Sequence, residues 1–144
     1  MKKALLVLVF LALGWQLKAE CPTEVEDFTF TDCNGVAYNL FELLDGEQYV
    51  LFHFVTNTST TSQTTTFVNT YHQFGCNGRD LFFMEVLPTK NDSVCRSWKE
   101  DQSVEFPVIG MDGGGNQFYS DYSSCIYYSG NNGYLLICPN HEIY

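Results

Sequence analysis

The chain has 144 residues, of which 17 are acidic and 7 are basic, so its formal charge at pH 7 is −10. A surface this acidic repels nucleic acid and anionic lipid, which argues against a nucleic-acid-binding protein. Aromatic residues make up 16% of the sequence, and this content argues against a disordered chain.

The first 19 residues have the order of a secretory signal peptide. Lys2 and Lys3 precede an apolar stretch over residues 4–15, and the small residue Ala19 ends the segment. The stretch is shorter than the roughly 20 residues that a membrane-spanning helix needs, and no later stretch is long enough. We therefore expect a signal peptide over 1–19, a periplasmic or secreted product without membrane insertion, and one domain over 20–144.

The first half of this domain contains three clear elements. Residues 27–38 alternate around the tight turn Asn34-Gly35 and predict a β-hairpin. Residues 39–44 fit a short helix with its leucines on one face. Residues 49–55 form an almost unbroken apolar run, which is typical of a central strand buried on both faces.

A polar stretch over 56–66 follows this strand and leads into a helix that ends near Phe74. Asn57, Ser59 or Thr60 is expected to cap this helix by accepting free backbone N–H groups. A buried strand is expected at 81–87, an amphipathic helix at 91–102 and an extended piece at 106–109. A flexible glycine loop is expected at 113–115, one or two helical turns at 117–122 and a last strand at 134–138. This alternation predicts an α/β fold with a mixed sheet covered by helices.

Six cysteines follow residue 19, an even number in a chain expected to reach an oxidising compartment. We expect them to form disulfides, and the sequence does not choose among the possible pairings. They are Cys21, Cys33, Cys76, Cys95, Cys125 and Cys138. No two are spaced as Cys-x-x-Cys, and His53, His72 and His141 show no metal-ligand spacing, so we expect no metal and no cofactor.

Three segments, residues 28–40, 51–57 and 134–140, together resemble the thioredoxin-like redoxins of the exported TlpA and AhpC/TSA type. The resemblance implies a thioredoxin-like three-layer fold, with a mixed β-sheet, flanking helices and an N-terminal β-hairpin. Those redoxins usually add a further strand and a closing helix after the segment that matches 134–138. This sequence ends at Tyr144, so we expect shortened C-terminal elements.

The resemblance also implies an altered active site. Redoxins place a Cys-x-x-Cys pair at the start of the helix after the central strand, where the helix N-terminus stabilises a thiolate. The two matching positions here are Ser59 and Ser62, and a serine hydroxyl ionises too weakly to exchange with a disulfide. A cis-proline before the last strand is the second landmark, and Asn132 takes its place. A cis bond without proline costs about 2.5–4 kcal/mol, so we expect a trans loop there.

These departures suggest a non-catalytic binding or structural module whose partner is another exported protein. The alternative is a thiol–disulfide oxidoreductase or peroxidase that uses relocated cysteines, with Cys95 and Cys125 as the candidates. A serine hydrolase using Ser59 or Ser62 would need a base such as His53. A histidine in a buried strand is more often packed and hydrogen-bonded than catalytic, which disfavours this third hypothesis.

Overall fold

A five-stranded mixed sheet forms the centre of the computed structural model, which describes residues 20–59, 61–74 and 77–144. The segment expected to be the signal peptide, 1–19, lies outside the described residues. The elements are β1 (Thr29–Thr31), β2 (Ala37–Asn39), α2 (Leu40–Asp45), β3 (Tyr49–Val55), α3 (Ser62–Gln73), β4 (Leu81–Val86), α4 (Asp92–Asp101), β5 (Val108–Ile109), the helical turn η1 (Met111–Gly115), α5 (Asn116–Tyr122), β6 (Tyr127–Ser129) and β7 (Asn132–Ile137).

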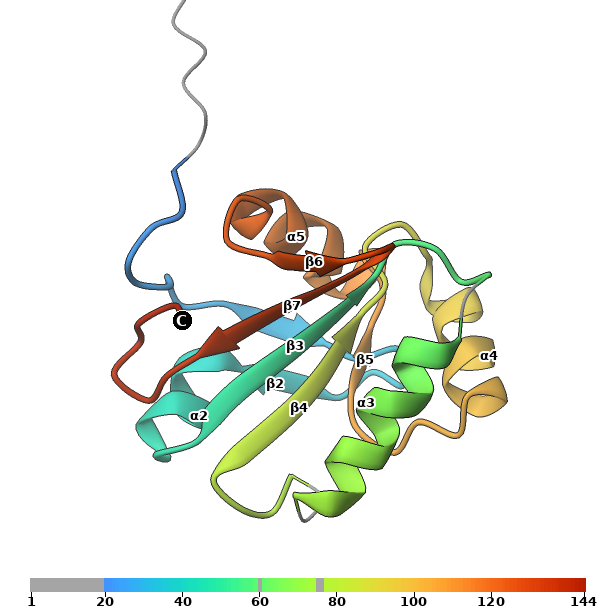
Figure 1. Ribbon diagram of the computed structural model, residues 1–144, viewed down its shortest axis with the longest axis horizontal. Helices are drawn as coiled ribbons and strands as arrows, with labels where there is room; N and C mark the ends of the chain where they lie inside the picture. Colours follow the sequence, from blue (N-terminus) through green and yellow to red (C-terminus); the bar gives the residue numbers. More distant parts are fainter. Residues whose placement is uncertain (1–19, 60, 75–76) are drawn as a thin grey trace, which may run out of the picture.

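Strand β3 lies in the middle of the sheet, whose strand order is β5-β4-β3-β7-β6. It runs parallel to β4 and antiparallel to β7 (Figure 1). The β1–β2 hairpin forms a separate two-stranded sheet. The predicted α/β fold with a mixed sheet and an N-terminal hairpin is therefore confirmed.

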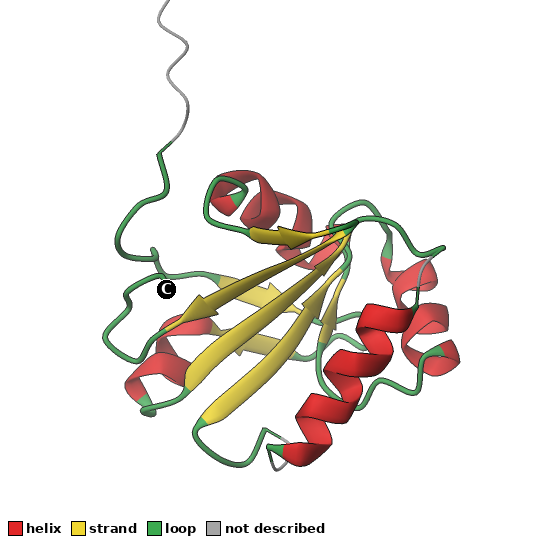
Figure 2. Cartoon of the chain, viewed as in Figure 1, coloured by secondary structure: helices red, strands yellow, loops and turns green. Residues whose placement is uncertain are grey.

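Each face of the sheet is covered by its own hydrophobic cluster. One face packs Phe52, Phe54 and Leu135 against Phe30 of the hairpin and Phe118 of α5. The other face carries the second cluster, to which α3 and α4 contribute (Figure 2). Successive side chains of a strand point to opposite faces, which explains why the run 49–55 is apolar at almost every position.

The hairpin loop closes the edge of the sheet at β5. The Cys33 backbone N–H donates to the Val108 carbonyl over 2.9 Å, and the Arg96 side chain donates to the Cys33 carbonyl over 2.8 Å. Asp32 stiffens the loop because its carboxylate accepts the backbone N–H groups of Asn34 and Val36. A covered edge lacks the open backbone groups through which exposed strands associate.

One expectation for the second half of the chain is wrong, and a second is confirmed only in part. The glycine run 113–115 is an ordered helical turn leading into α5, and Gly113 and Gly115 are buried. The chain at Asn132 is trans, as expected, but Asn132 begins β7 after the tight turn at residues 130–131, and it pairs with Ser129 of β6. No strand was predicted at β6, whose three residues are all exposed and therefore lack the apolar alternation of a half-buried strand.

After β7 the chain turns back on itself. Ile143 forms a bridge with Ile137, and the Tyr144 backbone N–H donates to the Leu136 carbonyl over 2.9 Å. Among the described residues, no helix has both the length and the apolar character needed to cross a membrane.

Substituting Gly113 by alanine should destabilise the fold. A Cβ at this position would overlap the Thr31 carbonyl oxygen, so β1 and η1 would have to separate. We expect a loss of about 1–3 kcal/mol, the usual cost of overpacking a tight interior, measured by urea denaturation. Gly46→Ala is the matched control, because the backbone φ of −75° at Gly46 suits alanine. Equal stability of the two variants would contradict the close packing of β1 on η1.

Candidate functional site

The start of α3 is the place where the resemblance locates chemistry. Helix α3 begins at Ser62, and Thr61 takes the cap position without a side-chain hydrogen bond to the helix. Of the residues expected to cap it, Asn57 instead accepts the Ser59 backbone N–H over 3.0 Å, and Thr60 lies outside the described residues. The N-terminus of α3 therefore has no side-chain cap from Thr61 and no acidic residue in its first turn.

Ser59 and Ser62 are both exposed. The Ser62 hydroxyl donates to the Gln63 side-chain oxygen over 2.8 Å. Neither serine has a hydrogen bond to His53, whose own bonds lie in the interior of the protein. A serine nucleophile needs a base within hydrogen-bond reach, so the geometry does not support the hydrolase hypothesis.

His53 belongs to a buried polar network on the face of the sheet covered by α3 and α4. Its Nδ1 lies 2.7 Å from Glu85 Oε2, and the indole N–H of Trp98 donates to Glu85 Oε1 over 2.6 Å. His53 and Glu85 are fully buried, and the His53 ring stacks on Tyr134 at 5.0 Å between centroids. The network connects β3, β4, β7 and α4, and His53 also packs on Phe67 of α3.

Glu85 and Trp98 were not predicted as members of a network. The sequence does contain one signal for the network: Glu85 is the single carboxylate in the otherwise apolar run 81–87. A buried charge requires a partner, so a polar neighbour could have been expected there. His53 was expected to be packed and hydrogen-bonded, and the structure agrees with that expectation.

Asn132 lies at the first position of β7, opposite Val55 at the end of β3. It is fully buried, and both polar atoms of its amide lack a hydrogen-bond partner in the described part of the chain. The turn before Asn132 is tied to the end of β3, because the Thr56 hydroxyl donates to the Asn131 carbonyl over 2.8 Å. No peptide bond among the described residues is cis. The backbone at Asn132 is thus an ordinary strand rather than the expected loop.

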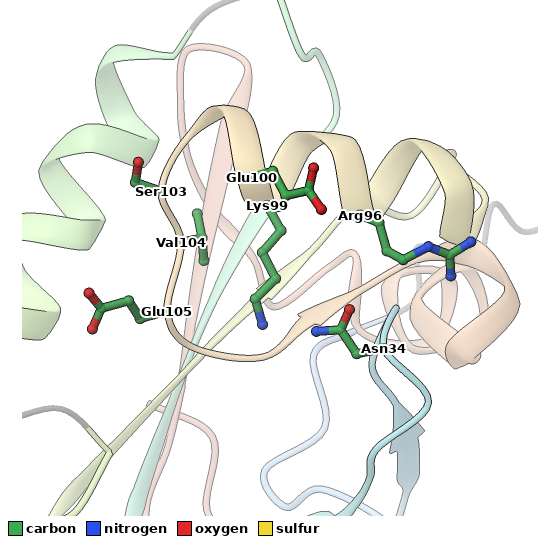
Figure 3. Close-up of a pocket in the computed structure, with 7 residues that line it drawn as sticks. All are labelled: Asn34, Arg96, Lys99, Glu100, Ser103, Val104 and Glu105. Atoms are coloured by element: carbon green, nitrogen blue, oxygen red, sulfur yellow. The ribbon is translucent and has the colours of Figure 1, made fainter.

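Two hollows flank α4. A groove of about 270 Å³ lies between α4 and the approach to α3, and its lining includes Thr58, Thr61 and Trp98. A second hollow of about 370 Å³ lies between α4, the segment after it and the hairpin loop (Figure 3). Arg96 and Lys99 line this second hollow, and Figure 3 shows Lys99 reaching toward Asn34. The groove next to Thr61 is the one that adjoins the redoxin-type site.

The cysteines that the structure describes do not assemble at the start of α3. Cys21 forms a disulfide with Cys125, with Cα atoms 4.9 Å apart, while Cys33, Cys95 and Cys138 are thiols. Cys76 lies outside the described residues. Cys95 and Cys125, the candidates for a relocated redox pair, are not joined: Cys95 packs in the cluster under α3 and α4, while Cys125 packs against the cluster on the opposite face. The sheet stands between them.

No group of three metal-ligating side chains that could hold an ion occurs among the described residues. His141, for which no metal role is expected, lies 3.0 Å from Asp45 Oδ1 and stacks on Phe41. It therefore ties the C-terminal segment to α2.

Comparison with solved structures identifies the architecture. A thiol–disulfide oxidoreductase from Bacteroides fragilis superposes with a TM-score of 0.67 at 8% identity, covering 83% of this chain and 86% of that one. The thioredoxin domain of a thiol–disulfide oxidoreductase from Bacteroides vulgatus gives 0.63 at 17% identity, with 86% of each chain covered. The chain has the thioredoxin-like fold.

The peroxidoxin BcpB from Mycobacterium tuberculosis shares this thioredoxin-like fold, with a TM-score of 0.65, 14% identity, and coverage of 86% of this chain and 82% of that one. No protein-family model and no curated protein matches the sequence. The fold is therefore shown by the structure, while the function has to be argued from the site.

Replacing Trp98 by phenylalanine should lower the stability of the protein, because it disrupts the buried network. The change removes one hydrogen bond to Glu85 and leaves a buried carboxylate oxygen without that donor. We expect the free energy of unfolding to fall by about 1–3 kcal/mol, measured by urea denaturation followed by circular dichroism. Val94→Ala on the same helix, at an exposed position, should cost less than about 0.5 kcal/mol. An unchanged stability for Trp98→Phe would contradict a structural role for the network.

Proposed function

We propose that this chain is an exported thioredoxin-like domain that acts as a binding or structural module and does not catalyse disulfide exchange at the start of α3. The observation that carries the proposal is the presence of Ser59 and Ser62 at the open N-terminus of this helix. A helix N-terminus activates a thiol by stabilising its thiolate, and a hydroxyl at the same place stays protonated at neutral pH. The chain thus keeps the thioredoxin-like fold but has no thiol at Ser59 or Ser62, where a redoxin would have its reactive cysteines.

The positions of the described cysteines support the same proposal. Cys21 and Cys125 are joined to each other, and Cys33 and Cys95 are buried beside β5. Cys138 follows β7, at the end of the sheet where β3 starts, because Ile137 pairs with Val50. Helix α3 follows the other end of β3, so Cys138 lies at the opposite end of the sheet from Ser59.

The alternative is a thiol–disulfide oxidoreductase or peroxidase with relocated cysteines. It draws on the similar structures described as oxidoreductases and a peroxidoxin. The pair named for it, Cys95 and Cys125, is divided by the sheet. Burial raises the pKa of the Cys95 thiol, which lowers the fraction of thiolate available for attack. The non-catalytic function is the one that the geometry favours.

The partner expected for such a module is another exported protein. The acidic surface disfavours nucleic acid, and the groove between α4 and the approach to α3 offers a mixed polar and apolar lining next to the start of α3. Trp98 lines this groove, and its indole N–H donates to Glu85.

Restoring the cysteines should restore the chemistry. The double variant Ser59→Cys/Ser62→Cys places two thiols at the N-terminus of α3, where the helix dipole lowers a thiol pKa. We expect it to speed the reduction of insulin disulfides by dithiothreitol at least about tenfold over the unaltered protein, which should match the protein-free rate. A tenfold rate corresponds to only about 1.4 kcal/mol of barrier.

Thr66→Cys/Asn69→Cys is the matched control, because it puts the same spacing on the exposed middle of α3. This control should remain near the protein-free rate. Activity of the unaltered protein well above that rate would overturn the non-catalytic function. Equal activity of the two cysteine variants would contradict the role assigned to the helix start.

A further inference from the structure

Two buried thiols meet at the edge strand β5, on elements far apart in the sequence. Cys33 lies in the loop of the N-terminal hairpin, and Cys95 lies in the first half of α4. Their exposed fractions are 1% and 0%. Both side chains belong to the cluster under α3 and α4.

Both cysteines are also anchored to the same backbone atom. The Cys33 backbone N–H donates to the Val108 carbonyl over 2.9 Å, and the Cys95 thiol donates to that carbonyl over 3.4 Å. The Arg96 guanidinium, next in sequence to Cys95, donates to the Cys33 carbonyl over 2.8 Å. Contacts to β5 and α4 thus hold the two residues together independently of any bond between the sulfurs.

We propose that Cys33 and Cys95 are a disulfide site, whose bond would fasten the hairpin loop to α4 across the edge strand β5. The pair would act together with Cys21–Cys125, which holds the other end of the hairpin segment next to α5. The N-terminal segment would then be covalently fixed on both sides of β1, once to each helical layer. A cross-link between residues far apart in sequence removes much of the conformational freedom of the unfolded chain.

The bond forms by exchange with an external disulfide, for which oxidised glutathione is the probe. A thiolate from one cysteine attacks glutathione disulfide, forms a mixed disulfide and releases one reduced glutathione. The second cysteine, as its thiolate, attacks the protein sulfur of that mixed disulfide and releases the second glutathione. Two protein thiols lose two protons and two electrons, and one glutathione disulfide becomes two thiols.

Burial determines when this exchange occurs. Desolvation raises the pKa of the Cys95 thiol, and the carboxylates of Asp92 and Glu85 act in the same direction. A protonated thiol in a closed core reacts slowly, so the bond should form during folding, before α4 closes over the hairpin loop. For the same reason the finished disulfide should resist reduction in the folded protein.

Peptide mapping of the full chain, refolded with oxidised glutathione, tests the proposal. Free thiols are blocked with N-ethylmaleimide in guanidinium, and the protein is digested without reduction. Trypsin cuts after Lys90 and Arg96 and so isolates Cys95 in a short peptide, while cleavage after acidic residues separates Cys33 from Cys21 and Cys76 at Glu26 and Glu42. We expect a peptide pair that joins Cys33 to Cys95 and that reduction separates.

Cysteine variants supply a second readout. Cys33→Ala, Cys95→Ala and the double variant should each lower the midpoint of thermal unfolding by at least about 5 °C, and the double variant should melt close to the single ones because all three lack the same bond. Cys138→Ala is the matched control and should leave the Cys33–Cys95 peptide pair in place. Blocking of both Cys33 and Cys95 by N-ethylmaleimide, or linkage of either one to a different cysteine, would overturn the proposal.

Discussion

The fold depends on β3, a strand buried on both faces and paired along both edges. Its parallel pairing with β4 and antiparallel pairing with β7 fix the register of the sheet, from Val50 opposite Ile137 to Val55 opposite Asn132. Because its side chains alternate between two hydrophobic clusters, β3 determines which helices cover which face. The segment that follows β3 leads to the start of α3, where the resemblance to redoxins places the active site.

The sheet also separates two pairs of described cysteines, one on each side. The Cys21–Cys125 disulfide lies on the side of the hairpin and α5, whereas Cys33 and Cys95 lie on the side of α3 and α4. A polar network lies in the interior on this second side, where Glu85 bonds to both His53 and Trp98. A buried carboxylate bonded on both oxygens stiffens the packing of α4 on the sheet without supplying a nucleophile.

The sequence predicted those elements whose signals are local. The run 49–55 became β3, and Asn39 and Asn91 cap the helices α2 and α4 that follow them. Features that depend on distant neighbours were missed. The strand β6 is recognisable only through its pairing with β7, and the glycine run is ordered because Gly113 packs on Thr31. The cysteine partners could not be deduced because spacing alone does not show which face of the sheet each cysteine joins.

The most direct test of a redoxin scaffold without its thiol chemistry is the pH dependence of thiol reactivity in the folded full chain. The initial rate of reaction with 5,5′-dithiobis(2-nitrobenzoic acid) would be measured between about pH 5 and pH 9, beside free cysteine with its thiol pKa near 8.5. The account predicts no thiol that reacts faster than free cysteine below pH 7. A rapid phase that persists to acidic pH would reveal an activated thiolate and contradict the account.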